Sequence, residues 1–69
     1  MEFKLKDNQE YIQLNNLLQV LQFAQTGGHA KIIIKNETVL VNEKIETQVR
    51  KKLKKGDTVL IDNNLITII

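Results

Sequence analysis

The stretch that decides the fold is Thr26-Gly27-Gly28-His29-Ala30-Lys31-Ile32-Ile33-Ile34-Lys35-Asn36. Apolar residues at positions 30, 33 and 34 recur at helical spacing, and the lysines at 31 and 35 fall on the opposite side. Thr26 carries a side chain that helix N-caps prefer, so a short helix is predicted to begin directly after it. Asn36 tolerates a positive φ and is predicted to end that helix in a left-handed conformation.

A longer helix is predicted before this stretch. Leucines at 14, 17, 18 and 21 follow the spacing i, i+3, i+4, i+7, while polar residues fill the other face, which predicts about three helical turns. The helix is expected to run out at Gln25-Thr26-Gly27-Gly28, where the glycines supply a left-handed stop. Further upstream, the alternation in residues 2–6 predicts a half-buried strand, followed by a turn at Asp7-Asn8.

The residues after the second helix are predicted to be β structure. Strands are expected at 38–42, 44–47, 58–61 and 65–69, with turns at 42–44, 55–57 and 62–64. Asp57 is expected to serve as an Asx-type turn former. The order is therefore one strand, two helices and several strands, with no proline and no internal repeat.

The composition favours one small folded domain over residues 1–69. The chain is 42% hydrophobic and 26% charged, which is enough apolar surface for a core but only for one. There is no cysteine, no run resembling a signal peptide, and no segment near the roughly 18 apolar residues that span a bilayer. We therefore expect a cytoplasmic protein of modest stability without a membrane partner.

The chemistry of most enzymes is missing. His29 is the only histidine, so a zinc site or a Cys–His nucleophile cannot be assembled, and no pair of carboxylates shares a predicted helix face. Gly27-Gly28 is too short for a P-loop or a dinucleotide fingerprint. The sequence predicts no catalytic residue, no metal and no cofactor. The start of the second helix, Thr26 to His29, is either a simple cap or an anion contact, and capping is the favoured interpretation.

The positive charge of the protein lies in one segment. Residues 44–55 hold six basic residues and one acid, a net charge of +5, whereas the whole chain carries +2. Such a run is either a solvated loop or a nucleic-acid contact, and residues 47–55 also allow a basic helix with Val49 and Leu53 on one stripe. The aromatic residues Phe3, Tyr11 and Phe23 are expected in the core, where Tyr11 could still show its hydroxyl to solvent.

Four short sequence motifs, and the order in which they occur, resemble the S4-type RNA-binding domain, named for a small-subunit ribosomal protein. The resemblance covers about residues 11–61, and it is closest to small stand-alone bacterial members of the YaaA and YbcJ kind. The four motifs are Thr26-Gly27-Gly28-His29-Ala30-Lys31, Ile33-Ile34, Val39-Leu40-Val41-Asn42, and Leu53-Lys54-Lys55-Gly56-Asp57-Thr58-Val59.

The resemblance implies an α+β fold with an αL motif, in which two short helices pack on a small, mostly antiparallel curled sheet. It further implies that the second helix and a neighbouring loop face structured RNA, with ribosomal RNA or a ribosome-assembly intermediate as the natural ligand. Two positions depart from the family pattern. Gly27 stands where many members carry arginine, and Asn42-Glu43 replaces an Asn-Gly turn.

The leading hypothesis is a non-catalytic RNA-binding module that contacts backbone phosphates. The expected contact residues are Thr26, Gly27, Gly28, His29, Lys31, Lys35, Arg50, Lys51 and Lys52. The alternative is a protein-interaction or adaptor domain that uses the edge of its terminal strand, residues 65–69. We expect the strand around Phe3 and Leu5 to cover that edge instead. A sulfur carrier of the ubiquitin-like kind is disfavoured, because the chain ends in Ile68-Ile69 and not in Gly-Gly.

Overall fold

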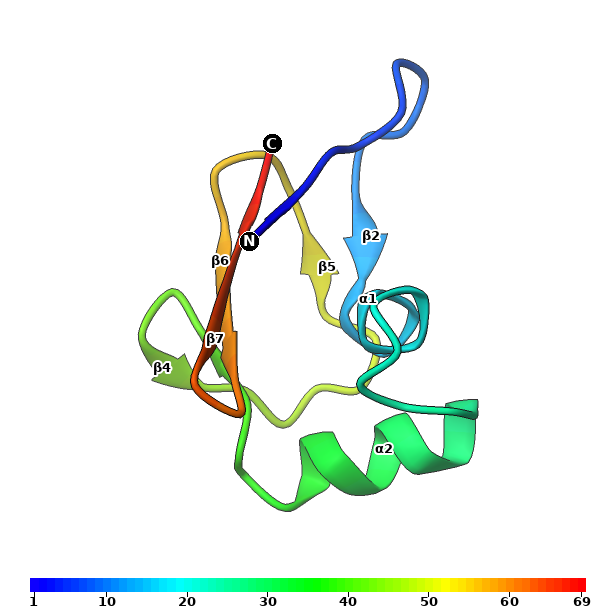
Figure 1. Ribbon diagram of the computed structural model, residues 1–69, viewed down its shortest axis with the longest axis vertical. Helices are drawn as coiled ribbons and strands as arrows, with labels where there is room; N and C mark the ends of the chain where they lie inside the picture. The colour runs from blue at the N-terminus through cyan, green and yellow to red at the C-terminus, as the bar shows by residue number, and fades with distance from the viewer.

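The computed structural model describes residues 1–69, and its largest element is a five-stranded sheet in the order β1-β7-β6-β3-β4 (Figure 1). The strands are β1 (Glu2–Phe3), β3 (Leu40–Val41), β4 (Lys44–Ile45), β6 (Thr58–Ile61) and β7 (Asn64–Ile68). All neighbours are antiparallel except β1 and β7, which run parallel. With the two helices, this arrangement confirms the predicted α+β class and the mostly antiparallel sheet.

Two tight hairpins link the strands where the sequence predicts turns. Asn42 and Glu43 connect β3 to β4 and both have positive φ, at 51° and 71°. Asp62 and Asn63 connect β6 to β7 with φ of 49° and 65°. Positive φ at both central residues is the signature of the type I′ turn, whose twist matches that of the flanking strands. Asparagine and aspartate tolerate this region, whereas Glu43 occupies it without their side-chain advantage.

The first helix, α1 (Leu14–Val20), is shorter than the leucine spacing predicts. Its last residue is Val20 and its C-cap is Leu21, and the left-handed residue that follows is Gln22, with φ 66°. The amide of Phe23 donates to the carbonyl of Leu18 at 2.8 Å and that of Gln22 to Gln19 at 3.0 Å, which is the Schellman pattern. The prediction of a glycine stop at 27–28 is therefore wrong, because backbone bonding ends the helix five residues earlier.

The second helix, α2 (Gly27–Lys35), begins where the sequence predicts. The hydroxyl of Thr26 accepts a hydrogen bond from the amide of His29 at 3.0 Å, which confirms the N-cap. The end differs from the prediction: Asn36 has φ −77°, and Glu37 is the left-handed residue, at 61°. The hydroxyl of Thr38 donates to the carbonyl of Ile33 at 3.1 Å and satisfies one of the last free acceptors of the helix.

A second, two-stranded sheet was not expected from the sequence. Strand β2 (Ile12–Gln13) pairs antiparallel with β5 (Lys52–Leu53), and the two lie side by side in Figure 1. The pairing continues into α1, since the amide of Leu14 donates to the carbonyl of Lys51 at 2.8 Å and that of Asn15 to Val49 at 3.0 Å. The alternative of a basic helix over 47–55 is therefore wrong: the segment is a turn and a strand pinned beside the start of α1.

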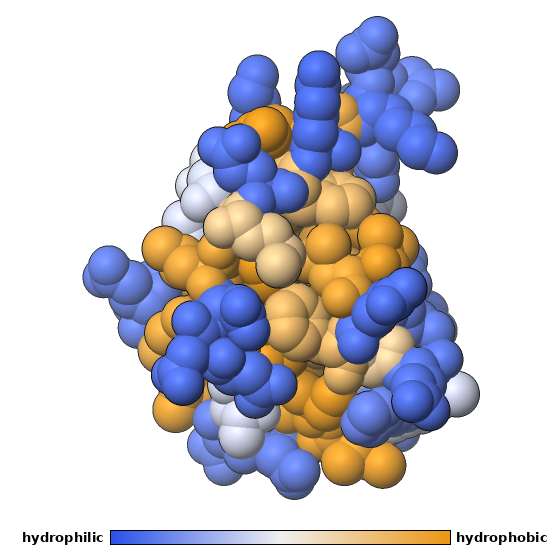
Figure 2. Space-filling model, viewed as in Figure 1, coloured by the Kyte–Doolittle hydropathy of each residue, from blue (hydrophilic) through white to orange (hydrophobic).

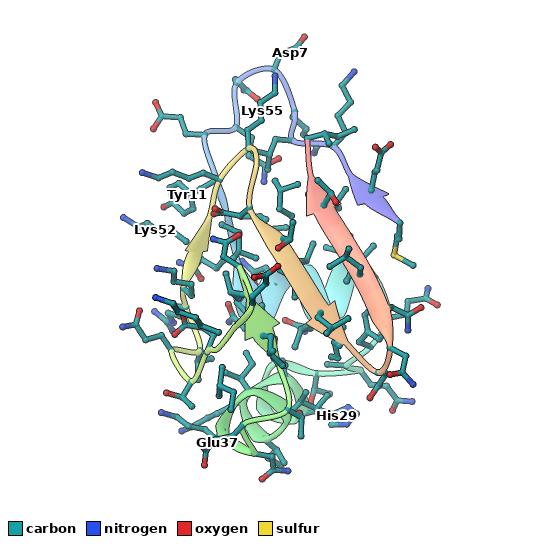
Figure 3. The ribbon with its side chains drawn as sticks, turned by 90° about the vertical axis from the view of Figure 1, so that its left-hand side faces the viewer. Asp7, Tyr11, His29, Glu37, Lys52 and Lys55 are labelled. Atoms are coloured by element: carbon teal, nitrogen blue, oxygen red, sulfur yellow. The ribbon has the colours of Figure 1, made fainter.

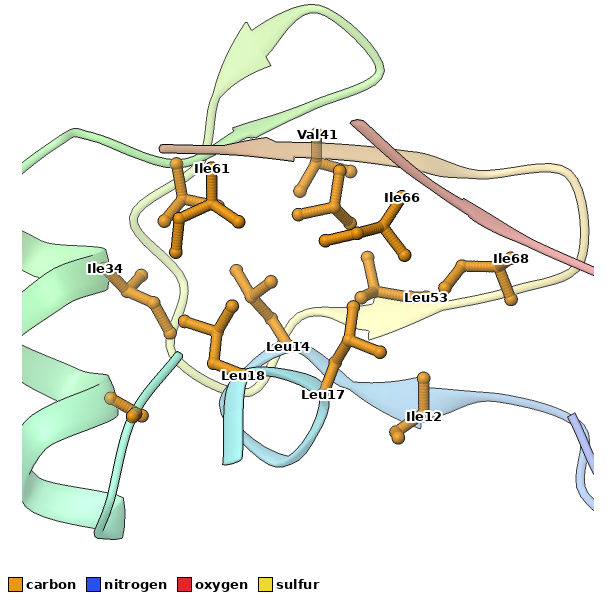
Figure 4. Packing of buried hydrophobic residues seen from close by; sticks show 14 residues of the cluster. Ile12, Leu14, Leu17, Leu18, Ile34, Val41, Leu53, Ile61, Ile66 and Ile68 are labelled. Atoms are coloured by element: carbon orange, nitrogen blue, oxygen red, sulfur yellow. The ribbon is translucent and has the colours of Figure 1, made fainter. Parts of the chain in front are cut away.

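The core lies between the five-stranded sheet, the helices and the small sheet (Figure 4). All fourteen buried residues are hydrophobic, with no polar or charged residue among them. Those labelled in Figure 4 are Ile12, Leu14, Leu17, Leu18, Ile34, Val41, Leu53, Ile61, Ile66 and Ile68. Phe3 and Phe23 pack against this cluster as predicted, but Tyr11 does not belong to it, which corrects its assignment to the core.

Strand β1 covers the edge of β7. Beyond the paired residues, the amide of Thr67 donates to the carbonyl of Met1 at 3.0 Å and the amide of Ile69 to Phe3 at 2.9 Å. This confirms that the N-terminal strand closes the terminal apolar strand. Hydrophobic residues nevertheless remain in the middle of the surface seen in Figure 2, with hydrophilic side chains projecting around them. Neither helix has the length and apolar character that crossing a lipid bilayer requires.

Candidate nucleic-acid interface

An open, mostly polar hollow lies between α2 and the loop that precedes β5. We call it the basic hollow. Its lining comes from three parts of the chain: the start of α1, one face of α2, and the turn at residues 49–50. The lining residues are Asn15, Gly27, Gly28, Lys31, Lys35, Val49 and Arg50.

Helix α2 contributes two lysines and two free backbone donors. Lys31 and Lys35 are four residues apart, so they lie one turn above each other on the exposed side, away from the buried Ala30 and Ile34. The amides of Gly27 and Gly28 take part in none of the hydrogen bonds of the fold. Unbonded N–H groups at a helix N-terminus attract anions, and here two ammonium groups stand beside them.

The two glycines are not required by the fold. A Cβ at Gly27 would meet nothing within 4 Å, and one at Gly28 would meet only the hydroxyl of Thr26, at 3.9 Å. Neither residue has a positive φ, the conformation that normally demands glycine. Alanine would suit a helix better at both places. Glycine instead leaves the backbone of the basic hollow open to close approach by a ligand.

A second hollow continues the positive surface along the chain segment 48–54. It is lined by Gln48, Arg50, Lys51, Lys52 and Lys54. Arg50 lines both hollows, so we treat them together as the basic surface. Glu46, the one acid among residues 44–55, accepts a hydrogen bond from the amide of Gln48 at 3.0 Å.

The end of the segment 48–54 is fixed by Asp57 in the turn that follows it, and Asp57 is in turn bonded by Asn42 of the β3–β4 hairpin. The carboxylate of Asp57 accepts from the amide of Lys54 at 2.7 Å and from the side-chain amide of Asn42 at 3.1 Å. The side-chain oxygen of Asn42 in turn accepts from the amide of Thr58 at 3.0 Å. Asp57 is thus the turn former that the sequence predicts. Lys54 is held at the end of the segment as a result.

Seven of the nine predicted contact residues line the basic surface, and two do not. The hydroxyl of Thr26 is engaged by the amide of His29, and Nδ1 of His29 accepts from the amide of Gln25 at 3.2 Å. Both side chains therefore serve the cap of α2. Figure 3 shows His29 at the lower end of the molecule, well away from Lys52 and Tyr11. RNA contact by the other seven stays a prediction.

Four residues that line the basic surface are not among the contact residues predicted from the sequence: Asn15, Gln48, Val49 and Lys54. Asn15 stands among the polar residues of α1, and nothing local marks it as part of a site. Its side-chain oxygen is buried without a hydrogen-bond partner, while its backbone amide holds the carbonyl of Val49. Lys54 could have been included from charge alone, because it belongs to the same basic run.

Comparison with known proteins agrees with this arrangement. A family model described as "S4 domain" matches residues 3–69. A search of curated proteins found no match. Among solved structures, YbcJ from E. coli superposes with a TM-score of 0.71 at 28% sequence identity, covering 99% of this chain and 85% of that one. Its solution structure is described as revealing an αL motif involved in RNA-binding. Since the family model spans nearly the whole sequence, the chain belongs to the S4 domain family.

Proposed function

We propose that this protein is a non-catalytic RNA-binding module that holds structured RNA by its backbone phosphates. The observation that carries the proposal is the continuous basic surface, in which a helix and a distant loop bring their cations to one hollow. The proposed contacts are Gly27, Gly28, Lys31, Lys35, Arg50, Lys51 and Lys52. Thr26 and His29 act by shaping the start of α2.

The chemistry of the surface suits a folded RNA backbone. Lysine offers a compact charge and arginine a planar fork of donors, and both bind phosphate oxygens. Two free amides on α2 add donors in fixed positions. Duplex RNA is recognised chiefly through its shape, its phosphates and its 2′-hydroxyls, because its deep major groove is closed to side chains. A rigid surface with cations on two walls of a hollow fits that kind of ligand.

The more specific part of the proposal is that the ligand is ribosomal RNA or a ribosome-assembly intermediate, bound in the cytoplasm by one domain formed from residues 1–69. Support comes from the S4 family membership and from the RNA-binding description of YbcJ, which shares the fold at 28% identity. Crosslinking in cells followed by sequencing of the bound RNA tests this point. Enrichment of messenger or transfer RNA over ribosomal RNA would overturn it.

Salt dependence tests the binding mode. If about five phosphates are neutralised, a plot of log affinity against log salt concentration should have a slope of roughly −3.5 to −4.5. The measurement is a titration of a structured RNA at several salt concentrations. A flat dependence, or no binding at low salt, would refute the RNA-binding proposal.

A protein-interaction role is the second candidate, favoured by a different observation. Pairing places Ile45, Leu40, Leu60 and Leu65 in one row across four neighbouring strands. Ile45 and Leu65 are 55% and 54% exposed, so this row is an apolar surface on the outer face of the sheet. The strand edge itself is closed by β1. Loss of RNA binding with unchanged protein partners on co-purification would favour this role.

A further inference from the structure

The outward face of the small β2–β5 sheet carries an aromatic ring, an amide and a lysine that the fold does not use. Ile12 and Leu53 are directly opposite each other and face the core, at 6% and 0% exposed. Side chains alternate along a strand, so Gln13 on β2 and Lys52 on β5 face the other way. Tyr11 directly precedes β2, and its ring lies beside the Lys52 side chain. Figure 3 shows Tyr11 and Lys52 projecting together from one side of the molecule.

Tyr11 is held against Lys52 and not in the core. The Lys52 ammonium nitrogen lies 5.0 Å from the centre of the tyrosine ring. A cation–π contact at an exposed site is weaker than the stacking of a nucleobase on an aromatic side chain, so a base can displace the ammonium from the ring. The displaced ammonium, carried on a flexible four-carbon stem, is then free to turn toward a phosphate.

The same face borders the basic surface. Lys52 lines the second hollow together with Arg50, and Arg50 also lines the basic hollow beside α2. An RNA backbone that leaves the basic hollow along Arg50 and Lys52 therefore arrives at Tyr11. Gln13 pairs with Lys52 in the strand register, so its side chain projects from the same face as Lys52 and can offer an amide donor and acceptor to the edge of a base.

We infer that the β2–β5 face is a subsite for one unpaired nucleotide next to the structured RNA in the basic hollow. The base stacks on Tyr11, the Gln13 amide meets its edge, and Lys52 meets its phosphate. This inference rests on the proposed RNA-binding function and adds the ligand class: helical RNA that carries a flanking unpaired nucleotide. Stacking is tolerant of base identity, so the subsite selects for an unpaired base more than for its sequence.

Two RNA probes separate this subsite from the basic hollow. One is a blunt-ended hairpin, and the other is the same hairpin with a short single-stranded extension on each strand. We expect the parent protein to bind the extended hairpin about tenfold more tightly, within the range that one base–aromatic stack provides. Tyr11→Phe keeps the ring and should keep the preference, whereas Tyr11→Leu should lose it and bind both hairpins alike. Lys31→Glu should weaken both hairpins while leaving the preference in place.

An optical measurement reports on the ring directly. Tyr11 is the only tyrosine and the chain has no tryptophan, so the intrinsic fluorescence of the protein comes from this side chain. The extended hairpin should quench it at saturation more strongly than the blunt hairpin does. An undiminished preference in folded Tyr11→Leu, or equal affinity of the parent for both hairpins, overturns the subsite but not the RNA-binding proposal. If the parent binds neither hairpin, both proposals fall.

Discussion

Helix α2 and the segment 48–54 deliver positive charge to the same hollow by different means. The helix carries Lys31 and Lys35 on a regular backbone that is docked by the buried Ala30 and Ile34. The segment has only two residues in a strand, yet its position is set by backbone bonds from the start of α1 and by Leu53, which is completely buried.

The contrast shows that a run of like charges need not be a loose loop. The carbonyls of Val49 and Lys51, on either side of Arg50, are both occupied by amides of α1. Arg50 is therefore carried on a stretch of backbone that is hydrogen-bonded to α1 on both sides. Pre-organised cations lose less conformational entropy when a ligand binds, which favours affinity.

The largest effect should come from removing the apolar anchor of either region. Leu53→Ala and Ile34→Ala should each lower the free energy of unfolding by about 2–5 kcal/mol, because both side chains are fully buried. That is enough to unfold much of a domain this small. Denaturant unfolding provides the measurement. Ile32→Ala is the matched control on α2, since Ile32 is 61% exposed and should change stability little.

A smaller effect, confined to binding, should follow from reversing one charge in each region. Lys31→Glu combined with Lys52→Glu should reduce RNA affinity tenfold or more, about 1.4 kcal/mol, with the fold intact. Lys4→Glu combined with Lys6→Glu changes the net charge equally at exposed positions outside the basic surface. An equal loss of RNA affinity in the two double variants would mean that net charge alone, and not the basic surface, governs binding.

Gly27→Ala should move stability and binding in opposite directions. Alanine meets no neighbour at this position and restricts the unfolded chain, so we expect a gain of about 0.5 kcal/mol in stability. The added methyl group projects where a phosphate would approach the backbone, so RNA affinity should fall by roughly fivefold, about 1 kcal/mol. Thermal melts and RNA titrations of the same preparation measure both quantities. Unchanged affinity would remove the backbone of α2 from the contact surface.

The smallest change is expected when the basic segment loses side chains but keeps its backbone bonds. Arg50→Ala combined with Lys51→Ala should shift the free energy of unfolding by no more than about 0.5 kcal/mol. The bonds that pin the segment use the main chain and persist in the double variant. A thermal melt of the double variant beside the parent protein measures this difference in stability. An unfolded double variant would show that these side chains hold the fold together.

Local signals account for what could be predicted from the sequence. Thr26 and the spacing of Ala30, Ile33 and Ile34 are contained within one helix, so they locate α2 and its exposed lysines. The turns at 42–43 and 62–63 are likewise signalled by Asn42, Asp62 and Asn63, which tolerate positive φ. Gln22 in the same conformation has no such signature, and the end of α1 was misplaced for that reason.

The features of the fold and of the site that could not be predicted depend on contacts between residues far apart in the sequence. Strands of two residues, such as β2 and β5, show no periodicity, and their partners lie about forty positions apart in the chain. The placement of Arg50 opposite Lys31 follows from that pairing, so charge counting could identify both residues without bringing them together. The residue type of Tyr11 favours the core, and only the structure shows its ring beside the Lys52 side chain on the outside of the small sheet.

The parallel pairing of β1 with β7 determines when this protein can finish folding during its synthesis. Glu2 and Phe3 are synthesised 65 residues before their partners, Thr67 and Ile68. At about 5–20 residues per second, β1 waits several seconds for its neighbour. Until then Ile66 and Ile68 are missing from the core, and its other members stay partly open to water. A nascent chain held on the ribosome short of residue 67 therefore exposes part of its hydrophobic core to water, which makes it prone to aggregate and a ligand for chaperones.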